Sequence, residues 1–378
     1  MSNIGVSYTV LPEPRAAAES LVNEARARLT NRPNLAILFA TADYDTQALV
    51  SRVQHELGDV PIWGGSSMNG VFANHRWVSA EKGAAALMLI ADRPAGAALA
   101  CVEDNPVATG TSAALAAIQQ AGGQVNAILT LAFMGPEEKL LEGVATAAPK
   151  VPVVGGSASD GAGRFWQFGA GRSEANAVSI GAVGGAVGYA FGHGYTPTGQ
   201  RAVVTRAQGR KIVELDRRPA LEVYMEWTKE PKANVFGGAI LTYSVFHPLL
   251  LRKNGVTLTV HPVNSNEDGS IDTGVAIIEG KTIELGWATP DQLINAIEPV
   301  VREAAKNVKQ PQAVILSHCG GRAIGLGERI AEAAGQVRKA VGEVPWIGYL
   351  AFGEQGCAAP GENVHANLSL SALVLGAD

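Results

Sequence analysis

A short apolar stretch that begins with Val-Pro occurs three times in this chain. It reads Val-Pro-Ile-Trp-Gly-Gly-Ser-Ser at 60–67, Val-Pro-Val-Val-Gly-Gly-Ser at 151–157 and Val-Pro-Trp-Ile-Gly-Tyr at 344–349. Each copy follows an apolar run typical of a buried strand and then a segment with helical periodicity. A pattern repeated in this way indicates copies of one structural unit. We therefore expect two tandem units, an inserted stretch of different character and a third related unit.

The order of strand, helix and strand in each copy predicts a βαβ unit. Residues 34–40 and 127–133 are continuous apolar runs, as expected of strands buried on both faces. A right-handed crossover makes the two strands of such a unit parallel. The runs 83–91 and 96–102, joined by Asp92-Arg93-Pro94, predict an antiparallel pair. The predicted fold class is α/β, with mixed sheets built from repeated βαβ units.

The character of the sequence changes near residue 201. Gln208-Gly209 between two apolar runs predicts a hairpin, and Pro219 is expected to open a helix. We predict one part at 1–200, with the two tandem units, and a second at 201–378, with the inserted α+β stretch and the third unit. The further strands predicted in the insertion are 238–245, 256–260, 274–278 and 282–285.

Composition limits the possible partners and compartments. Hydrophobic residues make up 47% and charged residues 17% of the 378 residues, which indicates an ordered globular protein. A net charge of −5 argues against a nucleic-acid partner. The longest uncharged segment, 175–195, is rich in glycine, so strands are expected there and no membrane span. Three cysteines without metal-like spacing, and no leader pattern, predict a cytoplasmic protein with reduced thiols and no metal.

Ligands of open α/β sheets lie beyond the carboxyl ends of parallel strands. The predicted glycine turns after two such strands offer N–H and hydroxyl groups to an anionic or zwitterionic ligand. For a single copy, a tight turn that binds no ligand is the more common interpretation. Neither is a nucleotide loop, because the lysine of that motif is missing. The candidate ligand-binding residues are Gly64, Gly65, Ser66, Ser67, Asn69, Gly155, Gly156, Ser157, His318, Cys319, Arg322 and Glu354.

The segment Ser317–Arg322 carries the densest set of reactive side chains. Arg322, at a strand–helix junction, is suited to clamp a carboxylate, or to pair with Glu354. His318 and Cys319 are adjacent on a strand and face opposite sides, so they do not form a dyad while the strand continues. No hydrolase elbow or paired carboxylates appear, so no enzymatic activity is expected. His247 and His261, each followed by proline, are the candidate axial ligands if haem binds.

Several of these stretches together resemble the FIST sensory domain. The order of strand, helix and Val-Pro-Ile-Trp-Gly-Gly-Ser-Ser-Met-Asn-Gly resembles its N-terminal half, and the similarity extends from about residue 34 to 375. The stretches that resemble its C-terminal half are Pro219–Tyr224, Phe246–Leu249, Asp268–Ser270, Glu279–Lys281, Cys319–Arg322 and Gly353–Gly356.

The resemblance implies a two-part architecture and a signal-input domain that binds small ligands, such as amino acids. Some relatives bind haem, sense nitric oxide and act on a partner histidine kinase or a cyclic-di-GMP enzyme. No kinase or cyclase segment is seen, so we expect this protein to act alone or through a partner chain.

Three functional hypotheses follow. The first is a stand-alone sensor without cofactor, which binds a carboxylate-bearing metabolite in a cleft between the tandem units and the C-terminal part. The second is a haem protein that senses nitric oxide. The third is an enzyme that uses Cys319 or His318.

Overall fold

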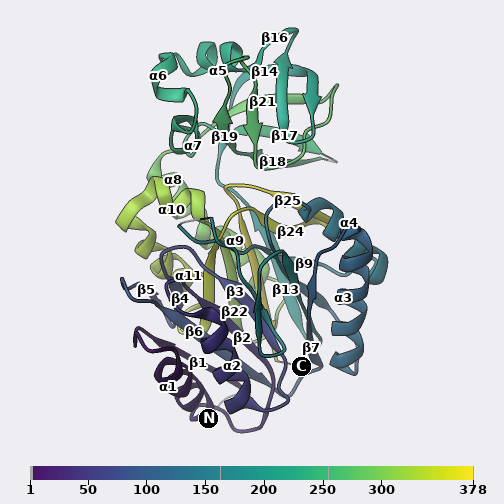
Figure 1. Ribbon diagram of the computed structural model, residues 1–378, viewed down its shortest axis with the longest axis vertical. Coiled ribbons are helices and arrows are strands. Elements are labelled where there is room, and N and C mark those ends of the chain that lie inside the picture. Colours follow the sequence, from purple (N-terminus) through teal and green to yellow (C-terminus); the bar gives the residue numbers. More distant parts are fainter. Residues whose placement is uncertain (1–2, 162, 254, 378) are drawn as a thin grey trace.

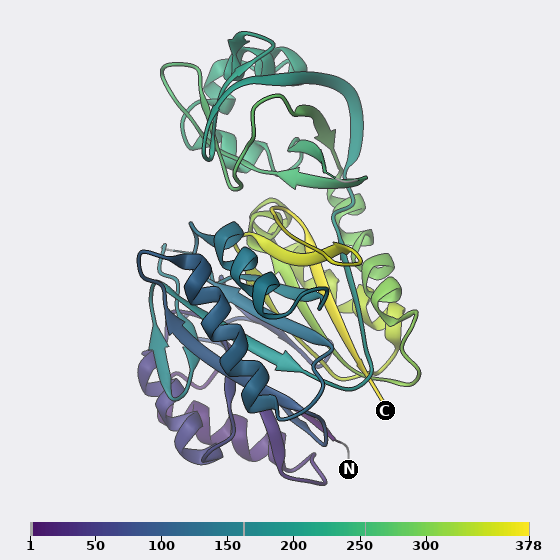
Figure 2. The ribbon, with the colours of Figure 1, turned by 90° about the vertical axis from the view of Figure 1, so that its right-hand side faces the viewer.

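The chain folds into a larger core and a smaller inserted body (Figures 1 and 2). The structure is a computed structural model, which describes residues 3–161, 163–253 and 255–377. The core holds three copies of one unit, with the order strand, helix, strand, helix, strand, hairpin, strand. The inserted body, residues 196–287, interrupts the third copy after its first strand. The predicted mixed α/β fold built from repeated βαβ units is confirmed, but the third unit begins at β13 (Val187–Gly192), before the insertion and not after it.

The first unit begins with two helices that cover one sheet face. Glu13 and Asp45 accept hydrogen bonds from the first backbone N–H groups of these helices, which fixes where each begins. Their apolar sides pack on the sheet and leave the charged sides in solvent. The elements are β1 (Ile4–Thr9), α1 (Pro14–Arg26), β2 (Pro33–Ala40), α2 (Thr46–Leu57), β3 (Ile62–Ser66), β4 (Val71–Ala73), β5 (Arg76–Val78) and β6 (Ala85–Ala91).

The second unit repeats this order. Asn105 caps its first helix, and the second helix starts after Pro136. The elements are β7 (Ala95–Cys101), α3 (Pro106–Ala121), β8 (Ala127–Ala132), α4 (Glu137–Ala147), β9 (Val153–Ser157), β10 (Gln167–Gly169), β11 (Arg172–Glu174) and β12 (Ala177–Val183).

The third unit has its helices broken into shorter pieces. Thr289 and Gln292 form a capping box that starts the helical region directly after the insertion. The elements are β13 (Val187–Gly192), α8 (Pro290–Asn295), α9 (Ile297–Ala305), β22 (Pro311–Cys319), α10 (Gly320–Leu326), a 3-10 helix (Gly327–Glu332), α11 (Ala333–Val341), β23 (Trp346–Ala351), β24 (Glu354–Ala359), β25 (Glu362–Ala366) and β26 (Leu370–Gly376).

Each unit completes its sheet with a hairpin from another unit. The strand orders are β1-β6-β2-β3-β10-β11, β7-β12-β8-β9-β24-β25 and β13-β26-β22-β23-β4-β5. The first unit takes the hairpin of the second, the second takes that of the third, and the third takes that of the first. The pairs β2–β3, β8–β9 and β22–β23 are parallel, as predicted. Because no unit holds a complete sheet alone, the three units form one interdependent core.

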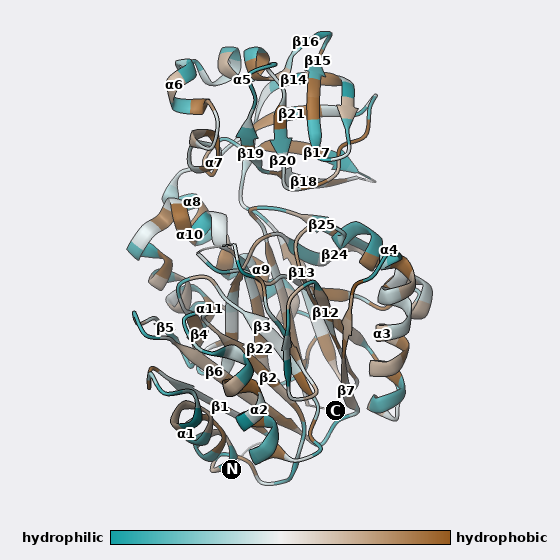
Figure 3. Ribbon diagram, viewed as in Figure 1, coloured by the Kyte–Doolittle hydropathy of each residue, from teal (hydrophilic) through white to brown (hydrophobic). Residues whose placement is uncertain are grey.

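The three sheets surround a common apolar centre. Phe39 of the first unit stacks on Tyr349 of the third, with ring centroids 4.4 Å apart, and meets Trp63 edge-on. Side chains of β8 and β9 complete this centre. The helices lie outside, and Figure 3 shows hydrophobic residues concentrated along the core strands. The predicted division near residue 200 falls inside β14 (Thr196–Gln208), the first strand of the inserted body, and so does not coincide with a boundary between that body and the core.

The inserted body has its own apolar core. Its mixed layers of strands and short helices lie above the core in Figure 1. Its elements are β14 (Thr196–Gln208), β15 (Lys211–Leu215), β16 (Arg218–Pro219), α5 (Ala220–Thr228), α6 (Lys232–Val235), α7 (Ala239–Tyr243), β17 (Leu249–Lys253), β18 (Val256–Val260), β19 (Pro262–Ser265), β20 (Ile271–Thr273) and β21 (Thr282–Trp287).

Three local predictions are wrong. The runs 83–91 and 96–102 do not pair with each other, because the turn at Asp92 carries the chain from one sheet to the next. Residues 238–245 contain the short helix α7, and 274–278 form no strand. A short apolar run is found in buried strands and in other buried segments alike. Hydrophobicity alone therefore did not distinguish a strand from a short helix or a loop at these positions.

The predicted glycine turns are also wrong, because these glycines lie inside strands. A Cβ on Gly64 would lie 1.8 Å from the Leu38 carbonyl oxygen, and one on Gly155 would lie 1.9 Å from that of Thr130. In each case the two residues are opposite one another in the parallel pair. The glycine therefore lets the neighbouring backbone approach closely. Within the described ranges, no helix is long and apolar enough to cross a membrane.

Candidate functional site

A cavity of about 370 Å³ lies where the inserted body meets the core. The segments that follow β8, β22 and β23 form its lower side, so it lies beyond the carboxyl ends of parallel strands, as expected for this class of sheet. The inserted body forms its upper side. The lining residues are Met134, Glu137, Arg210, Leu241, His261, Val263, Thr273, Gly274, Cys319, Gly321, Ile324, Phe352, Gly353 and Asn367.

The walls of the cavity are apolar on both sides. Met134, Ile324 and Phe352 come from the core, and Leu241 and Val263 face them from the inserted body. Met134 and Ile324 are large hydrophobic side chains that remain exposed. A ligand with an apolar part covers apolar surface on both bodies. These walls therefore favour such a ligand.

A group of charged residues forms one end of the cavity. Nη2 of Arg210, from the turn between β14 and β15, lies 2.7 Å from Oε2 of Glu137 and 2.6 Å from Oε2 of Glu138. Burial opposes the charge on Arg210, but the two carboxylates outweigh it and raise the pKa of the guanidinium. Glu137 is only 1% exposed, and Arg210 is the cation that pairs with it. The charged group joins the two bodies.

A second layer of polar groups supports Glu137. Ser157 Oγ donates to Glu137 Oε1 at 3.1 Å, and the backbone N–H of Gly135 donates to Oε2 at 2.7 Å. His365 Nε2 lies 3.8 Å from Oε1, and neither ring nitrogen of His365 has a hydrogen-bond partner among the described residues. Burial opposes ionisation of Glu138, but His365 and Arg210 lower its pKa. Glu137 is thus held in one orientation.

The inner end of the cavity, its floor, receives residues from both bodies and is polar and uncharged. His261 Nε2 lies 2.9 Å from the Leu241 carbonyl oxygen, and burial lowers the pKa of His261 to about 4. Burial also raises the pKa of the Cys319 thiol, and the nearby Glu354 adds to that effect. Asn367 Oδ1 accepts from the backbone N–H of His261 at 3.3 Å. Near neutral pH the floor therefore presents a neutral imidazole, a thiol and an amide.

Arg322 and Glu354 lie beneath this floor and do not line the cavity. Arg322 is fully buried and donates to the carbonyl oxygens of His193, at 3.2 Å, and Leu293. Glu354 accepts from the Ser369 N–H at 2.8 Å, and its other carboxylate oxygen has no partner in the described part of the chain. Burial raises the pKa of Glu354 despite the nearby Arg322 charge. Arg322 presents no free edge to a ligand in this conformation.

The remaining predicted residues are dispersed. Gly64, Gly65, Gly155 and Gly156 are buried strand residues, and Ser66 N–H donates to the Trp166 carbonyl. His318 is buried, and burial holds its pKa well below the usual value. Ser67 and Asn69 line a separate pocket of about 160 Å³ beside Asp160 and Arg164.

The cavity therefore joins only two of the twelve predicted residues. Cys319 lines it directly, and Ser157 contacts it through Glu137. Sequence reasoning missed Glu137, Glu138 and Arg210. Acidic residues in the first turn of a helix are common helix-stabilising features, so they carried no functional signal in the sequence.

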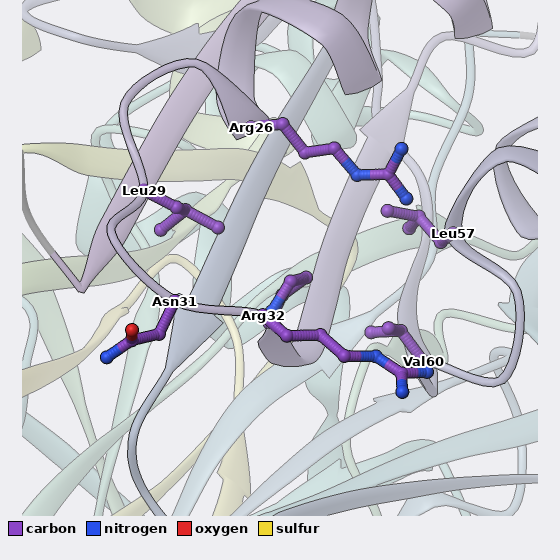
Figure 4. A pocket seen from close by; sticks show the side chains of 7 residues that line it. Arg26, Leu29, Asn31, Arg32, Leu57 and Val60 are labelled. Carbon is purple, nitrogen blue, oxygen red and sulfur yellow. The ribbon is translucent and has the colours of Figure 1, made fainter.

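A second hollow lies in the first unit, where α1 and α2 end and β2 begins (Figure 4). Its floor is Leu29, Leu57 and Val60, and Arg26 and Arg32 extend along its rim. Arg26 donates to the Glu56 carbonyl, and Arg32 pairs with Asp59. Because both arginines already have partners on an exposed surface, this hollow is a weaker candidate than the cavity.

The two candidate axial histidines differ in their surroundings. His261 lines the cavity, and its Nε2 lies 2.9 Å from the Leu241 carbonyl oxygen, so Nδ1 is the ring nitrogen left with a free lone pair for a haem iron. His247 stacks on Tyr243, with centroids 4.7 Å apart, and does not line the cavity. Among the described residues, no group of three or more His, Cys, Asp or Glu side chains is placed to hold a metal ion.

Comparison with known proteins places the chain in a family. The model of the FIST N domain matches residues 34–218, and that of the FIST C domain matches residues 220–357. The chain belongs to the FIST family. FIST domains are sensory domains of signal transduction that bind small ligands.

Three proteins of similar sequence are named only as uncharacterised proteins. Two proteins of Mycobacterium tuberculosis, from strains CDC 1551 and H37Rv, are 26% identical over 98% of this chain and 99% of theirs. A protein of Methanocaldococcus jannaschii is 27% identical over 59% of this chain, and this chain spans about half (48%) of its length. Among solved structures, cyanuric acid hydrolase from A. caulinodans covers 100% of both chains, at 10% identity and a TM-score of 0.39. That likeness is too low to bear on fold or function.

Proposed function

We propose that this protein is a sensor that binds a small carboxylate-bearing metabolite, such as an amino acid, in the cavity between the inserted body and the core. The observation that carries the proposal is the cavity itself, which combines apolar walls from both bodies with a charged end built around Arg210. A recognition site needs few polar groups in a mostly apolar hollow, and this cavity has that character.

Arg210 is the proposed anchor for the ligand carboxylate. Glu137 and Glu138 both contact Nη2, and within the described ranges Nη1 and Nε donate to no protein group. Nη1 and Nε therefore remain as separate donors, and each can donate a hydrogen bond to a ligand carboxylate oxygen. Glu137 lies on the same side and suits an ammonium group. This anchor replaces Arg322, whose guanidinium is engaged beneath the floor.

The sensor's output is proposed to pass to a separate signalling protein, such as a histidine kinase. The support is the match to sensory domains along residues 34–357, since a sensory domain transmits its state to an effector.

Thermal unfolding of the purified protein tests the ligand class. A ligand present at about 100 times its Kd stabilises the folded state by about 2.7 kcal/mol, a readily measured rise in Tm. The amino acids are screened first. Leucine, for example, is then compared with isocaproate, which lacks the amino group, and isoamylamine, which lacks the carboxylate. The proposal expects leucine and isocaproate to stabilise more than isoamylamine. The carboxylate assignment is wrong if only the amine stabilises.

A pair of variants tests the location. Ile324→Trp fills the mouth of the cavity, whereas Ile278→Trp adds the same ring at an exposed position outside it. The ligand-induced rise in Tm should be lost in the first and kept in the second. An unchanged rise in Ile324→Trp places the ligand elsewhere. A haem titration of the wild type runs alongside, and a Soret band that shifts with nitric oxide would support the haem alternative instead.

A further inference from the structure

We propose that the inserted body is a lid that closes on the cavity, with Arg322 as its pivot and the contacts of Arg210 with Glu137 and Glu138 as an ionic latch. The inference adds a mode of regulation to the proposed ligand site. It is tested without any ligand, so its failure and the failure of ligand binding are distinguishable.

The pivot lies where the chain passes between the two bodies. The chain enters the inserted body after β13 and leaves it before α8, and Figure 2 shows both crossings on the same side. Arg322 donates to the carbonyl of His193, just before the first crossing, and to that of Leu293, just after the second. Tyr195 donates from its hydroxyl to the Val245 carbonyl at 2.6 Å. These buried bonds hold the two crossings together.

The latch lies on the other side of the junction. In Figure 1, α8 and α10 lie at the left below the inserted body, and α4 lies at the right. The first turn of α4 carries both carboxylates, and the inserted body supplies Arg210 to both. Glu138 Oε1 also accepts from the Ala276 N–H at 2.9 Å. Opening the lid must break all these contacts, and it exposes the cavity between them.

The latch responds to salt, unlike the other contacts between the bodies. Arg210 keeps 26% of its side chain exposed, so mobile ions reach the pair and screen it. Thr259 and Asn367 also join the bodies, through the Asn367 N–H to the Thr259 carbonyl at 3.1 Å and through the Thr259 hydroxyl. Those groups are neutral. The proposed ligand binds Arg210 through its carboxylate and places its apolar part between the two walls. It therefore contacts both bodies and shifts the population of the protein to the closed state.

The test measures the distance between two spin labels in the full-length protein. Labels go on cysteines introduced at Leu115 of the core and Val203 of the inserted body, both exposed, in a Cys101→Ser background. Distance distributions are recorded at about 0.1 M and about 1 M salt, where the Debye length is about 10 Å and about 3 Å.

The wild type should show one closed distance at low salt and a second, changed distance at high salt. Arg210→Gln should populate the second distance roughly twofold more at low salt, with little further change on adding salt. Thr259→Val should also raise the open population but keep the salt response. Arg206→Gln, which removes a pair with Glu214 inside the inserted body, is the matched control and should behave as the wild type.

Two results overturn the inference. One is a distribution in Arg210→Gln equal to that of the wild type at both salt concentrations. The other is an equal change in Arg206→Gln, because the effect would then follow net charge and not the latch. If Arg210→Gln does not fold, the salt response of the wild type decides, and its absence rejects the latch.

Discussion

Arg322 donates a hydrogen bond to the carbonyl oxygen of His193 at 3.2 Å, although 129 residues separate them in the chain. The same guanidinium reaches the carbonyl of Leu293. One buried cation thus fastens the two points at which the chain enters and leaves the inserted body.

Replacing this cation should weaken the whole core. Arg322→Met removes the hydrogen bonds of the guanidinium to the His193 and Leu293 carbonyl oxygens and the positive charge near Glu354, so we expect a loss of about 2 to 4 kcal/mol in the free energy of unfolding. Urea denaturation measures it. Arg338→Met, at an exposed pair with Glu343, is the control and should change stability by less than about 0.5 kcal/mol. Equal losses in the two variants would contradict the assigned role.

The strand glycines should be intolerant of a single methyl group. A Cβ on Gly64 meets the Leu38 carbonyl oxygen at 1.8 Å, so Gly64→Ala should destabilise the protein by about 3 kcal/mol or more. Gly335 lies in α11, where an added Cβ would have open space around it, so Gly335→Ala should stabilise by about 0.5 to 1 kcal/mol. Thermal unfolding of both variants checks the pair, and a harmless Gly64→Ala would show that the strands can separate.

Glu354 should make the protein less stable as the pH rises. Burial raises the pKa of Glu354 above its unfolded value of 4.5, so above that value the unfolded chain loses a proton that the folded chain keeps. Stability from this group is full below pH 4.5 and falls as the pH rises toward the folded pKa. We expect the difference in unfolding free energy between wild type and Glu354→Gln to change in this direction between about pH 5 and pH 8.

Two histidines, His193 and His261, act in the opposite sense, and the comparison of wild type with Glu354→Gln removes their effect. Burial lowers the pKa of His193 and His261 to about 4 from 6.5. Their contribution is therefore full above pH 6.5 and is lost as the pH falls toward 4. Both histidines remain in Glu354→Gln, so their effect cancels in the difference. A difference that does not vary with pH would mean that Glu354 is ionised in the folded protein.

Thiol labelling should distinguish the three cysteines. Cys101 is exposed, whereas Cys319 and Cys357 are buried and burial raises the pKa of both thiols. A thiolate-selective reagent should therefore react quickly with one thiol in the native protein and with all three after unfolding. The Cys101→Ser variant should show almost no fast reaction. Fast labelling of Cys319 would revive the enzyme hypothesis based on that residue.

The sequence alone determined the repeated unit, the parallel pairing within it and the family. These features depend on local information: apolar runs, helical periodicity and a short motif that recurs at 60, 151 and 344. The motif's glycine was recognised but misinterpreted, because a close approach between strands and a tight turn both select glycine.

Only the tertiary structure decided the exchange of hairpins and the position of the charged end of the cavity. Which sheet edge a hairpin joins depends on the free edges of the other units, and its own residues do not specify that edge. Glu137 and Arg210 are 73 residues apart, on a helix and a turn that read as ordinary surface segments. Their contact arises because the insertion folds back over the second unit, an arrangement set by packing between bodies and not by any local pattern.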